Sequence, residues 1–192
     1  MKDMRTHTSA AREAKRATPA RPAVPMRRIS SPLGELVLVA NEGGNALEGI
    51  YFARQKHFPA DTATWRDARD TPLLDQAEAQ LHEYFAGRRT SFELPLAPAG
   101  TPFQRRVWQA IAGVPFGTTI SYAELARRIG TPSAVRAAAA ATGRNPLTVV
   151  IPCHRIVGSD GRMTGYAGGL ERKRALLDLE GPSGDAAARK VA

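Results

Sequence analysis

The stretch over residues 121–143 (SYAELARRIGTPSAVRAAAAATG) predicts the fold of the second half of the chain. Ser121 and Glu124 have the spacing of a capping box, so we expect a helix over residues 121–129. A glycine- and proline-containing turn follows, and then an alanine-rich helix over residues 134–143. Two short helices joined by such a turn are typical of a helix-turn-helix.

The second helix of this pair contains five consecutive alanines, residues 137–141, directly after Arg136. Alanine is the strongest helix former, and its small side chain leaves a smooth helix face. Such a face allows either the close approach of DNA or tight packing against another helix, and the sequence leaves both open. The helix pair therefore indicates DNA binding without proving it.

Residues 144–155 (RNPLTVVIPCHR) carry the strongest chemical signal, directly after the helix pair. The apolar, β-branched run over residues 147–151 predicts a short buried strand. Pro152 ends this run, and Cys153 and His154 follow at once. A strand that ends in a cysteine and a histidine can present a nucleophile rigidly.

Cys153, the only cysteine of the chain, is the candidate nucleophile. The thiolate is the reactive form, so it needs a lowered pKa or a nearby base. His154 is the nearest base, but adjacent side chains on an extended chain point apart, so we expect a bridging water between them. Glu180, at the end of the last helix, is the candidate partner that orients His154. The alternative is a buried cysteine with a purely structural role.

The segment before the helix pair predicts one more helix and a linker. Thr101 and Pro102 form a helix start, and apolar residues repeat at helical spacing as far as the stretch over residues 113–117. Residues 94–100 (LPLAPAG) are typical of a linker.

The first half of the chain predicts a small α/β domain. Residues 34–40 (GELVLVA) and 46–52 (ALEGIYF) are expected to form strands, and residues 56–70 a loop. Thr71 then begins a helix that ends near Gly87. Nothing in this half indicates chemistry.

We therefore expect four parts along the chain. A flexible basic tail over residues 1–26 is either an electrostatic tether to DNA or dispensable. The folded parts are a small α/β domain over residues 27–97 and a mainly helical, winged-helix-like domain with the helix-turn-helix over residues 98–183. Residues 184–192 are expected to be a second disordered tail.

The charge is distributed unevenly along the 192 residues. Residues 1–28 hold eight Lys or Arg against two Asp or Glu, residues 29–99 hold six against ten, and residues 100–192 hold thirteen against six. The helical part is therefore basic in its own right, beside an acidic domain. This pattern is typical of a domain that contacts a polyanion such as nucleic acid, and also of a merely solvated basic surface.

Several classes of protein are disfavoured by composition. No apolar run reaches the roughly 18 residues of a membrane span, and the N-terminus lacks the apolar core of a secretory signal. A single cysteine excludes an internal disulfide, and no cysteine–histidine cluster of the zinc type is present. We expect a cytoplasmic protein without membrane contact and without a bound metal.

The blocks around Cys153 resemble those of the O6-alkylguanine-DNA alkyltransferases, also called methylated-DNA–protein-cysteine methyltransferases. The resemblance covers residues 101–181, nearly all of the second half, in six ordered blocks at compatible spacings. The blocks include PCHR at residues 152–155, NP at 145–146, GYAGG at 165–169 and the last helix up to Glu180 and Gly181. The first half is compatible with the variable N-terminal domain of that family.

The resemblance implies the chemistry of direct DNA repair. Cys153 would attack the alkyl carbon of O6-alkylguanine in double-stranded DNA, with O4-alkylthymine as a further candidate substrate. His154 would act as the base through water, and Glu180 would steady it. Asn145 would order the active-site turn. The thioether product is a poor leaving group, so we expect one turnover per molecule and no cofactor. We also expect a monomer in solution.

The resemblance also implies how DNA is held. A base inside the duplex is out of reach, so the target nucleotide must be flipped out. Tyr122 would crowd a phosphate and contribute to the reaction, and Arg136 would fill the gap left in the base stack. The alanine-rich helix would enter the minor groove, whose degenerate code suits a search for damage. The further candidate DNA contacts are Ser121, Ala137, Ala138 and Arg144.

The resemblance places the flipped base in a pocket. Its candidate lining residues are Pro152, Ile156, Tyr166, Ala167 and Gly168. Ala167 departs from relatives that have serine at this position, which leaves only the backbone as a donor there. The choice between methyl and larger adducts does not follow from the sequence.

Three other functions compete with this interpretation. A non-enzymatic alkyltransferase-like protein would bind damaged DNA, but such proteins lack the reactive cysteine that this chain retains. A helix-turn-helix regulator would bind a specific sequence without alkyl transfer. A cysteine hydrolase would turn over repeatedly and need an oxyanion site, for which the sequence shows no motif.

Overall fold

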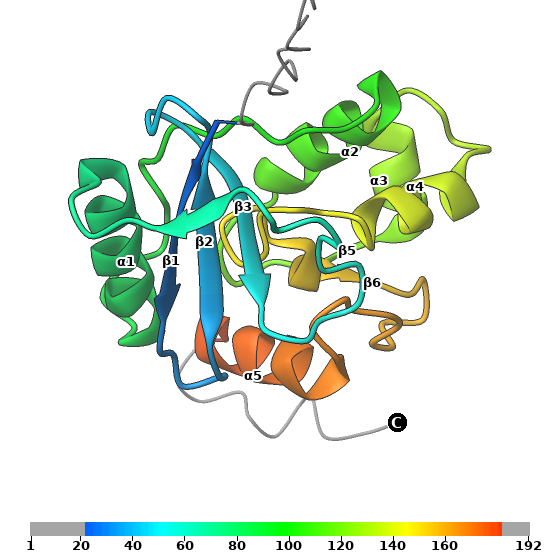
Figure 1. The fold of residues 1–192 in the computed structure, drawn as a ribbon. Coiled ribbons are helices and arrows are strands. Elements are labelled where there is room, and N and C mark those ends of the chain that lie inside the picture. The colour runs from blue at the N-terminus through cyan, green and yellow to red at the C-terminus, as the bar shows by residue number, and fades with distance from the viewer. Residues whose placement is uncertain (1–21, 182–192) are drawn as a thin grey trace, which may run out of the picture.

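The N-terminal half forms a four-stranded sheet covered by one helix (Figure 1). The computed structural model describes residues 22–181. Strand β1 pairs antiparallel with β2 and parallel with β4, and β2 pairs antiparallel with β3, so the order is β3-β2-β1-β4. The elements are β1 (Val24–Ile29), β2 (Leu36–Ala40), β3 (Leu47–Phe52), β4 (Trp65–Asp67) and α1 (Pro72–Phe85).

The two faces of this sheet are buried differently. One face packs against α1 and against the C-terminal half in a single hydrophobic core. The other face holds a small separate cluster, in which Tyr51 lies beside Phe58 and Trp65 from the segment after β3. The connection between β3 and β4 is therefore folded back onto the sheet and fixed there.

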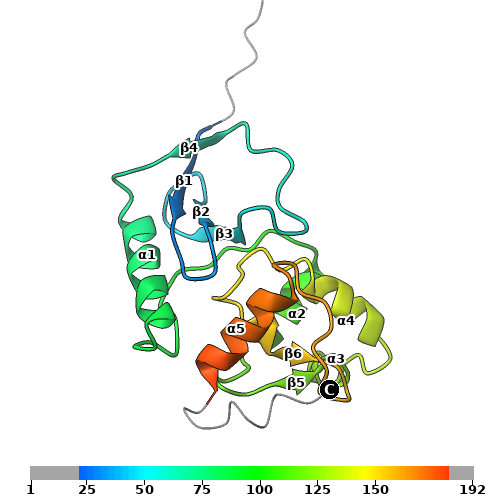
Figure 2. The same cartoon turned by 90° about the horizontal axis from the view of Figure 1, so that it is seen from below.

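The C-terminal half is mainly helical, and Figure 2 shows it as a separate group of elements below the sheet. Helices α3 and α4 form the helix-turn-helix, and α2 packs against both. The short strands β5 and β6 pair in parallel. The elements are α2 (Pro102–Ala112), β5 (Ile120–Ser121), α3 (Tyr122–Arg128), α4 (Val135–Thr142), the 3₁₀ turn η1 (Cys153–Arg155), β6 (Ile156–Val157) and α5 (Leu170–Glu180).

The predicted helix starts are found where the sequence placed them. Thr101 caps α2 in a complete capping box with Gln104. The Ser121 hydroxyl caps α3 by accepting from the Glu124 backbone N–H, but the Glu124 carboxylate pairs with Arg127 and Arg128 instead of closing the box. Helix α1 follows Thr71 without a hydrogen bond from its side chain.

The edge of β3 joins the two halves. Ile50 donates its backbone N–H to the Pro146 carbonyl oxygen and accepts from the Thr148 N–H, at 2.8 and 3.0 Å. Near the other end of the strand, Leu47 makes the same kind of bridge to Leu96 in the predicted linker. The N-terminal sheet thus holds the segment that leads to Cys153.

The predicted strand over residues 147–151 is wrong. Only Leu147 makes a β-bridge, and the Ile151 N–H donates back to the Leu147 carbonyl oxygen as in a helical turn. Val149 adopts a φ of 71°, which a strand does not allow. The side chain of Asn145 holds this turn at both ends, so local bonding overrides the β-branched composition.

The predicted fold class, a small α/β domain followed by a helical domain with a helix-turn-helix, is confirmed. Four strands were not predicted: β1 begins at Val24, inside the predicted tail, β4 lies inside the predicted loop, and the two-residue strands β5 and β6 pair with each other. Strands β1 and β4 lack alternation, and they form because β1 pairs with both β2 and β4. Residues 1–21 of the predicted N-terminal tail (residues 1–26) and the predicted C-terminal tail over residues 184–192 lie outside the described residues. Within residues 22–181, no helix is both long and apolar enough to span a membrane.

Candidate active site

Asn145 organises the turn that carries the cysteine. Its side chain is buried, and its Nδ2 donates both to the Ile151 carbonyl oxygen at 2.8 Å and to the Cys153 Sγ at 3.2 Å. Its Oδ1 accepts from the Leu147 N–H at 3.0 Å. One amide therefore fixes the backbone of the turn and the position of the sulfur.

The Cys153 side chain is buried, with 6% of the residue exposed. Burial raises the pKa of the Cys153 thiol, whereas the hydrogen bond from Asn145 and the charge of Lys173 act in the opposite direction. The resting residue is therefore a thiol. It has to lose its proton during the reaction, which requires an acceptor close by.

His154 has the geometry of such an acceptor. It is fully buried, and its Nε2 lies 2.9 Å from the Glu180 Oε1. Its Nδ1 has no hydrogen-bond partner among the described residues. Burial lowers the pKa of His154, which keeps the ring neutral. A neutral ring that donates from Nε2 to Glu180 presents the lone pair of Nδ1 as a proton acceptor.

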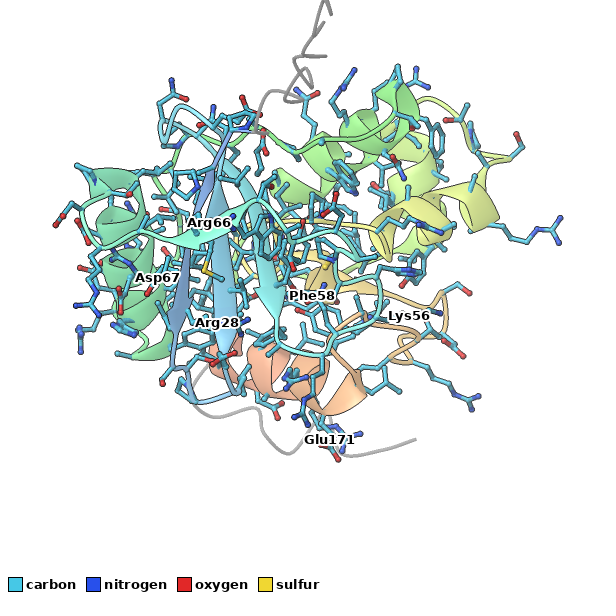
Figure 3. All side chains as sticks on the ribbon, in the orientation of Figure 1. Arg28, Lys56, Phe58, Arg66, Asp67 and Glu171 are labelled. Atoms are coloured by element: carbon cyan, nitrogen blue, oxygen red, sulfur yellow. The ribbon has the colours of Figure 1, made fainter. Side chains whose placement is uncertain are left out.

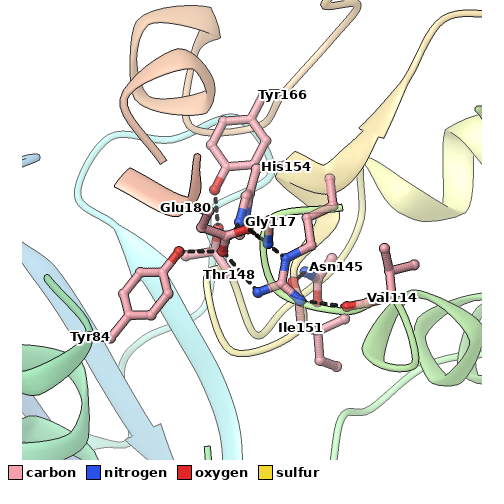
Figure 4. A network of polar contacts seen from close by, with 10 residues as sticks. Tyr84, Val114, Gly117, Asn145, Thr148, Ile151, His154, Tyr166 and Glu180 are labelled. Carbon is pink, nitrogen blue, oxygen red and sulfur yellow. Dashed lines mark hydrogen bonds and ion pairs between the residues drawn. The ribbon is translucent and has the colours of Figure 1, made fainter. Parts of the chain in front are cut away.

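The carboxylate of Glu180 is surrounded by donors (Figure 4). Its Oε1 accepts from His154, from Arg155 Nη2 at 2.8 Å and from the Tyr84 hydroxyl at 2.6 Å. Its Oε2 accepts from Arg155 Nε at 2.8 Å. Burial alone would raise the pKa of Glu180, but the hydrogen bonds from His154, Arg155 and Tyr84 lower it to about 2. Glu180 thus remains an anion that orients and polarises His154.

Cys153 contributes to the wall of a cavity of about 640 Å³. The helix-turn-helix forms one side, with Tyr122 from α3 and Arg136 and Arg144 from α4 and its C-terminal end. The loop before α5 forms another side, with Thr164, Gly165, Tyr166 and Ala167. The remaining lining residues are Lys56, His57, Val135, Ala139, Ala140, Thr142 and Gly143.

Tyr166 and Lys173 fix the loop side of this cavity. The Tyr166 hydroxyl lies 2.8 Å from the Thr148 Oγ1, which ties the loop to the turn that precedes Cys153. The buried Lys173 donates from Nζ to the Ile156 and Thr164 carbonyl oxygens at 2.5 and 3.0 Å. Burial lowers the pKa of Lys173 to about 8. The cavity wall is therefore held by specific bonds on both sides of the sulfur.

Four residues predicted for the interface or the pocket lie elsewhere. Ala138 lies on the buried face of α4 and is fully buried, so it cannot contact DNA. Ile156 is fully buried opposite Ile120 in the β5–β6 pair, and it does not line the cavity. Pro152 and Gly168 are buried and also lie off the cavity wall. These four positions are part of the packed interior and do not form the cavity surface.

The other predicted residues lie in or next to the cavity region. Tyr122, Arg136, Arg144, Tyr166 and Ala167 line the cavity with Cys153. Ala137 is exposed on α4, and Ser121 serves as the N-cap of α3. Asn145, His154 and Glu180 are buried and do not line the cavity, and Asn145 bonds directly to the sulfur.

Sequence reasoning missed Lys56, His57, Tyr84, Thr148 and Lys173. The first three belong to the N-terminal half, where no motif marked them, and they reach the site only through packing between the halves. Lys173 sits on a helix with many charged residues, and no local pattern distinguishes it from its exposed neighbours. Thr148 is part of the run that suggested a strand.

The chain is similar to known proteins over both halves. Residues 102–182 match the DNA-binding domain of 6-O-methylguanine DNA methyltransferase, and residues 26–98 match its ribonuclease-like domain. A methylated-DNA–protein-cysteine methyltransferase of Mycobacterium tuberculosis is 44% identical over 154 residues, which cover 80% of this chain and 90% of that protein. The protein of the same name from Methanosarcina barkeri is 45% identical over 152 residues, with 79% and 94% coverage.

Solved structures show the same likeness. Mycobacterium tuberculosis OGT in complex with DNA superposes with a TM-score of 0.76 at 41% identity, and the match covers 83% of this chain and 96% of that one. The O6-methylguanine methyltransferase of the same organism matches with a TM-score of 0.74 at 42% identity and the same coverage.

Proposed function

Because the chain belongs to the 6-O-methylguanine DNA methyltransferase family, we propose that Cys153 is the residue that accepts the alkyl group. The protein binds DNA and repairs it directly, as a methylated-DNA–protein-cysteine methyltransferase. The observation that carries the assignment is the position of Cys153 in the wall of the cavity, directly before His154 in the chain, whose ring is paired with the buried Glu180.

The reaction is a displacement at the alkyl carbon. The Cys153 sulfur forms the new S–C bond while the bond between that carbon and the guanine O6 breaks, and the electron pair of the broken bond stays on guanine. The thiol proton passes to the Nδ1 of His154 through a bridging water, and the imidazolium returns this proton through water to guanine, which leaves as the neutral base. Protons and charge therefore balance without a cofactor.

Glu180 makes this proton transfer favourable. An imidazolium beside an ionised carboxylate is stabilised, so His154 gains basicity at the moment the thiolate forms. Because four further hydrogen bonds hold the carboxylate, Glu180 keeps its charge and does not take the proton itself. Asn145 donates to the sulfur and stabilises the developing thiolate.

The substrate is O6-alkylguanine in double-stranded DNA, which the protein binds as a monomer. The base has to leave the stack to reach the sulfur, at a cost of a few kcal/mol. Arg136, exposed on α4 at the cavity, fills the gap in the stack, and Tyr122 on α3 faces the phosphate of the flipped nucleotide. A free thiol nucleophile needs a reducing compartment, so we place the protein in the cytoplasm.

Intact-mass spectrometry tests this assignment. After incubation with an O6-methylguanine duplex, the wild-type protein should gain one methyl group, on the peptide that contains Cys153, with a yield of one group per molecule. Cys153→Ala should gain none while retaining DNA binding. A Cys153→Ala protein that still demethylates the duplex, or a wild-type protein that turns over repeatedly, would overturn the proposal.

A further inference from the structure

The cavity has a basic side that the helix-turn-helix does not provide. Lys56 and His57 line it together with Arg144, although they belong to the connection between β3 and β4 in the acidic N-terminal half. Figure 3 shows Lys56 on this connection, on the side of the sheet that faces α4. We propose that Lys56 and His57, with Arg144, bind the sugar–phosphate backbone of the DNA strand that carries the damaged base.

The segment that carries these residues is held in one conformation. Gln55 accepts with its side chain from the Phe52 N–H at 2.9 Å, and its own N–H donates to the Phe52 carbonyl oxygen. On the far side, Phe58 packs against Tyr51 and Trp65 with ring centroids 5.5 and 5.9 Å away. Lys56 and His57 therefore lie on a short span between two fixed points.

The same span is bonded directly to the cavity wall. The Lys56 N–H donates to the Ala167 carbonyl oxygen at 2.9 Å, so the N-terminal half and the loop before α5 meet beside Tyr166. His57 adopts a φ of 62°, a left-handed conformation that disfavours a residue with a β-carbon. Such strain is retained where the surrounding structure imposes it, often at binding sites.

The positive charges around the cavity are not neutralised by the protein. Lys56, Arg136 and Arg144 are exposed, and no described residue forms an ion pair with their side chains. By contrast, Arg27, Arg28 and Arg89 of the same N-terminal half each pair with a carboxylate. Burial, followed by the nearby charges of Arg144 and Lys56, lowers the pKa of His57.

A DNA backbone is the partner that fits this arrangement. When a nucleotide turns into the cavity, its base enters and its flanking phosphates stay at the rim. Arg136 on α4 occupies one side of that rim, and Lys56 and Arg144 occupy the side toward the N-terminal half. Phosphate contacts position a protein on DNA without reading sequence, which suits an enzyme that recognises damage. The inference rests on the proposed function, because it places the flipped nucleotide in this cavity.

The salt dependence of DNA binding measures these contacts. Each phosphate contact contributes about 0.9 to the slope of log K against log salt concentration. Lys56→Gln should therefore lower the magnitude of this slope by about 0.9 for a duplex with a single O6-methylguanine. Lys56→Arg should restore the slope because it keeps the charge.

Arg66→Gln is the matched control. Arg66 is also an exposed cation of the N-terminal half, but it lies on β4, away from the cavity, and donates to the backbone oxygens of Ala63 and Trp65. This variant should keep the wild-type slope. An unchanged slope in Lys56→Gln, or an equal decrease in Arg66→Gln, would overturn the proposal.

Failure of this inference can be told apart from failure of the proposed function. The salt slope is measured by equilibrium binding in the unreactive Cys153→Ala background, so it does not involve alkyl transfer. The wild-type reaction with the free base O6-benzylguanine requires Cys153 and no phosphate contact. Wild-type protein that takes no alkyl group from either this base or the O6-methylguanine duplex contradicts the role of Cys153, whereas the slope of Lys56→Gln alone decides whether the basic rim binds DNA.

Discussion

The two halves of the molecule contribute to the same site in different ways. The C-terminal half supplies the proposed reacting groups from one short stretch, in which Asn145, Cys153 and His154 lie within ten residues. The N-terminal half supplies no reacting group, yet Tyr84 reaches Glu180, the edge of β3 holds the active-site turn and Lys56 reaches the cavity. The comparison shows that a short sequence motif can carry the chemical groups of a site, whereas the positions of those groups depend on contacts with the other half of the molecule.

The charges of the two halves are also stabilised differently. Around Glu180, cations and donors surround a buried anion, so removal of one partner leaves an uncompensated charge away from water. Around the cavity rim, exposed cations lack partners, so their removal should cost little stability. We expect variants of the first kind to affect folding and variants of the second kind to affect DNA binding.

The largest effect is expected for Glu180→Gln. This change leaves the guanidinium of Arg155, 7% exposed, without its carboxylate. Breaking a buried ion pair costs about 3–5 kcal/mol, and urea unfolding should show a loss of this size. Glu171→Gln is the control, because Glu171 is an exposed carboxylate on the same helix (Figure 3), and it should stay within about 0.5 kcal/mol of wild type. Equal losses in the two variants would contradict the special role of the buried network.

The same network predicts the direction of acid destabilisation. The pKa of Glu180 falls from 4.5 to about 2 on folding, so its contribution is present above pH 4.5 and is lost as the pH falls toward 2. The pKa of His154 is lowered from 6.5 because the folded protein buries it, so protonation of the unfolded chain reduces stability below pH 6.5. The free energy of unfolding should therefore decrease steadily from pH 6.5 downward. Glu180→Gln should show a shallower decrease below pH 4.5, and parallel curves for the two proteins would refute this account.

The C-terminal half could be predicted well because its signals are local. The capping residues Thr101 and Ser121 and the turn at Gly130 act within a few residues, so the helices follow from the sequence. Glu180 could be named as a candidate partner of His154, but its closeness did not follow from the sequence, because 26 residues separate them. Their distance of 2.9 Å depends on how α5 packs against η1.

The contribution of the N-terminal half could not be predicted for the same physical reason. Strand β1 contains Pro25 and two arginines, and it is a strand only because β2 and β4 pair with it. Tyr84 fits the apolar repeat of α1 like any core residue, and only the tertiary structure places its hydroxyl on Glu180. Residues whose role depends on contacts between the halves leave no pattern in the sequence around them.

A further test concerns Arg136, an exposed cation at the cavity that we expect to affect reaction with DNA and not folding. Arg136→Ala should slow repair of duplex DNA by roughly tenfold, because the side chain offsets part of the few kcal/mol needed to unstack the base. Reaction with free O6-benzylguanine should fall less, since no base is flipped. Arg174→Ala, an exposed arginine on α5 away from the cavity, should leave both rates unchanged. Stopped-flow rates with both substrates measure this, and equal losses on the two substrates would exclude the stacking role.

The smallest effect is expected for Tyr84→Phe, and it tests how the N-terminal half acts on the chemistry. The variant keeps the ring that packs against Phe92 and Phe116 but removes the hydrogen bond to Glu180. Because that bond withdraws charge from the carboxylate, its loss leaves Glu180 a stronger acceptor, and the pKa of His154 should rise. A hydrogen bond worth about 1 kcal/mol, felt only partly by His154, corresponds to roughly half a pKa unit.

His154 accepts the thiol proton only when it is neutral, so the acidic limb of the pH–rate profile should move to higher pH in Tyr84→Phe. The rate on the plateau above that limb should change little. Phe92→Leu disturbs the same aromatic packing without touching Glu180, so it should lower stability and leave the limb in place. A lower plateau with an unmoved limb in Tyr84→Phe would mean that Tyr84 contributes only packing. The N-terminal half would then stabilise the site without changing the pKa of His154.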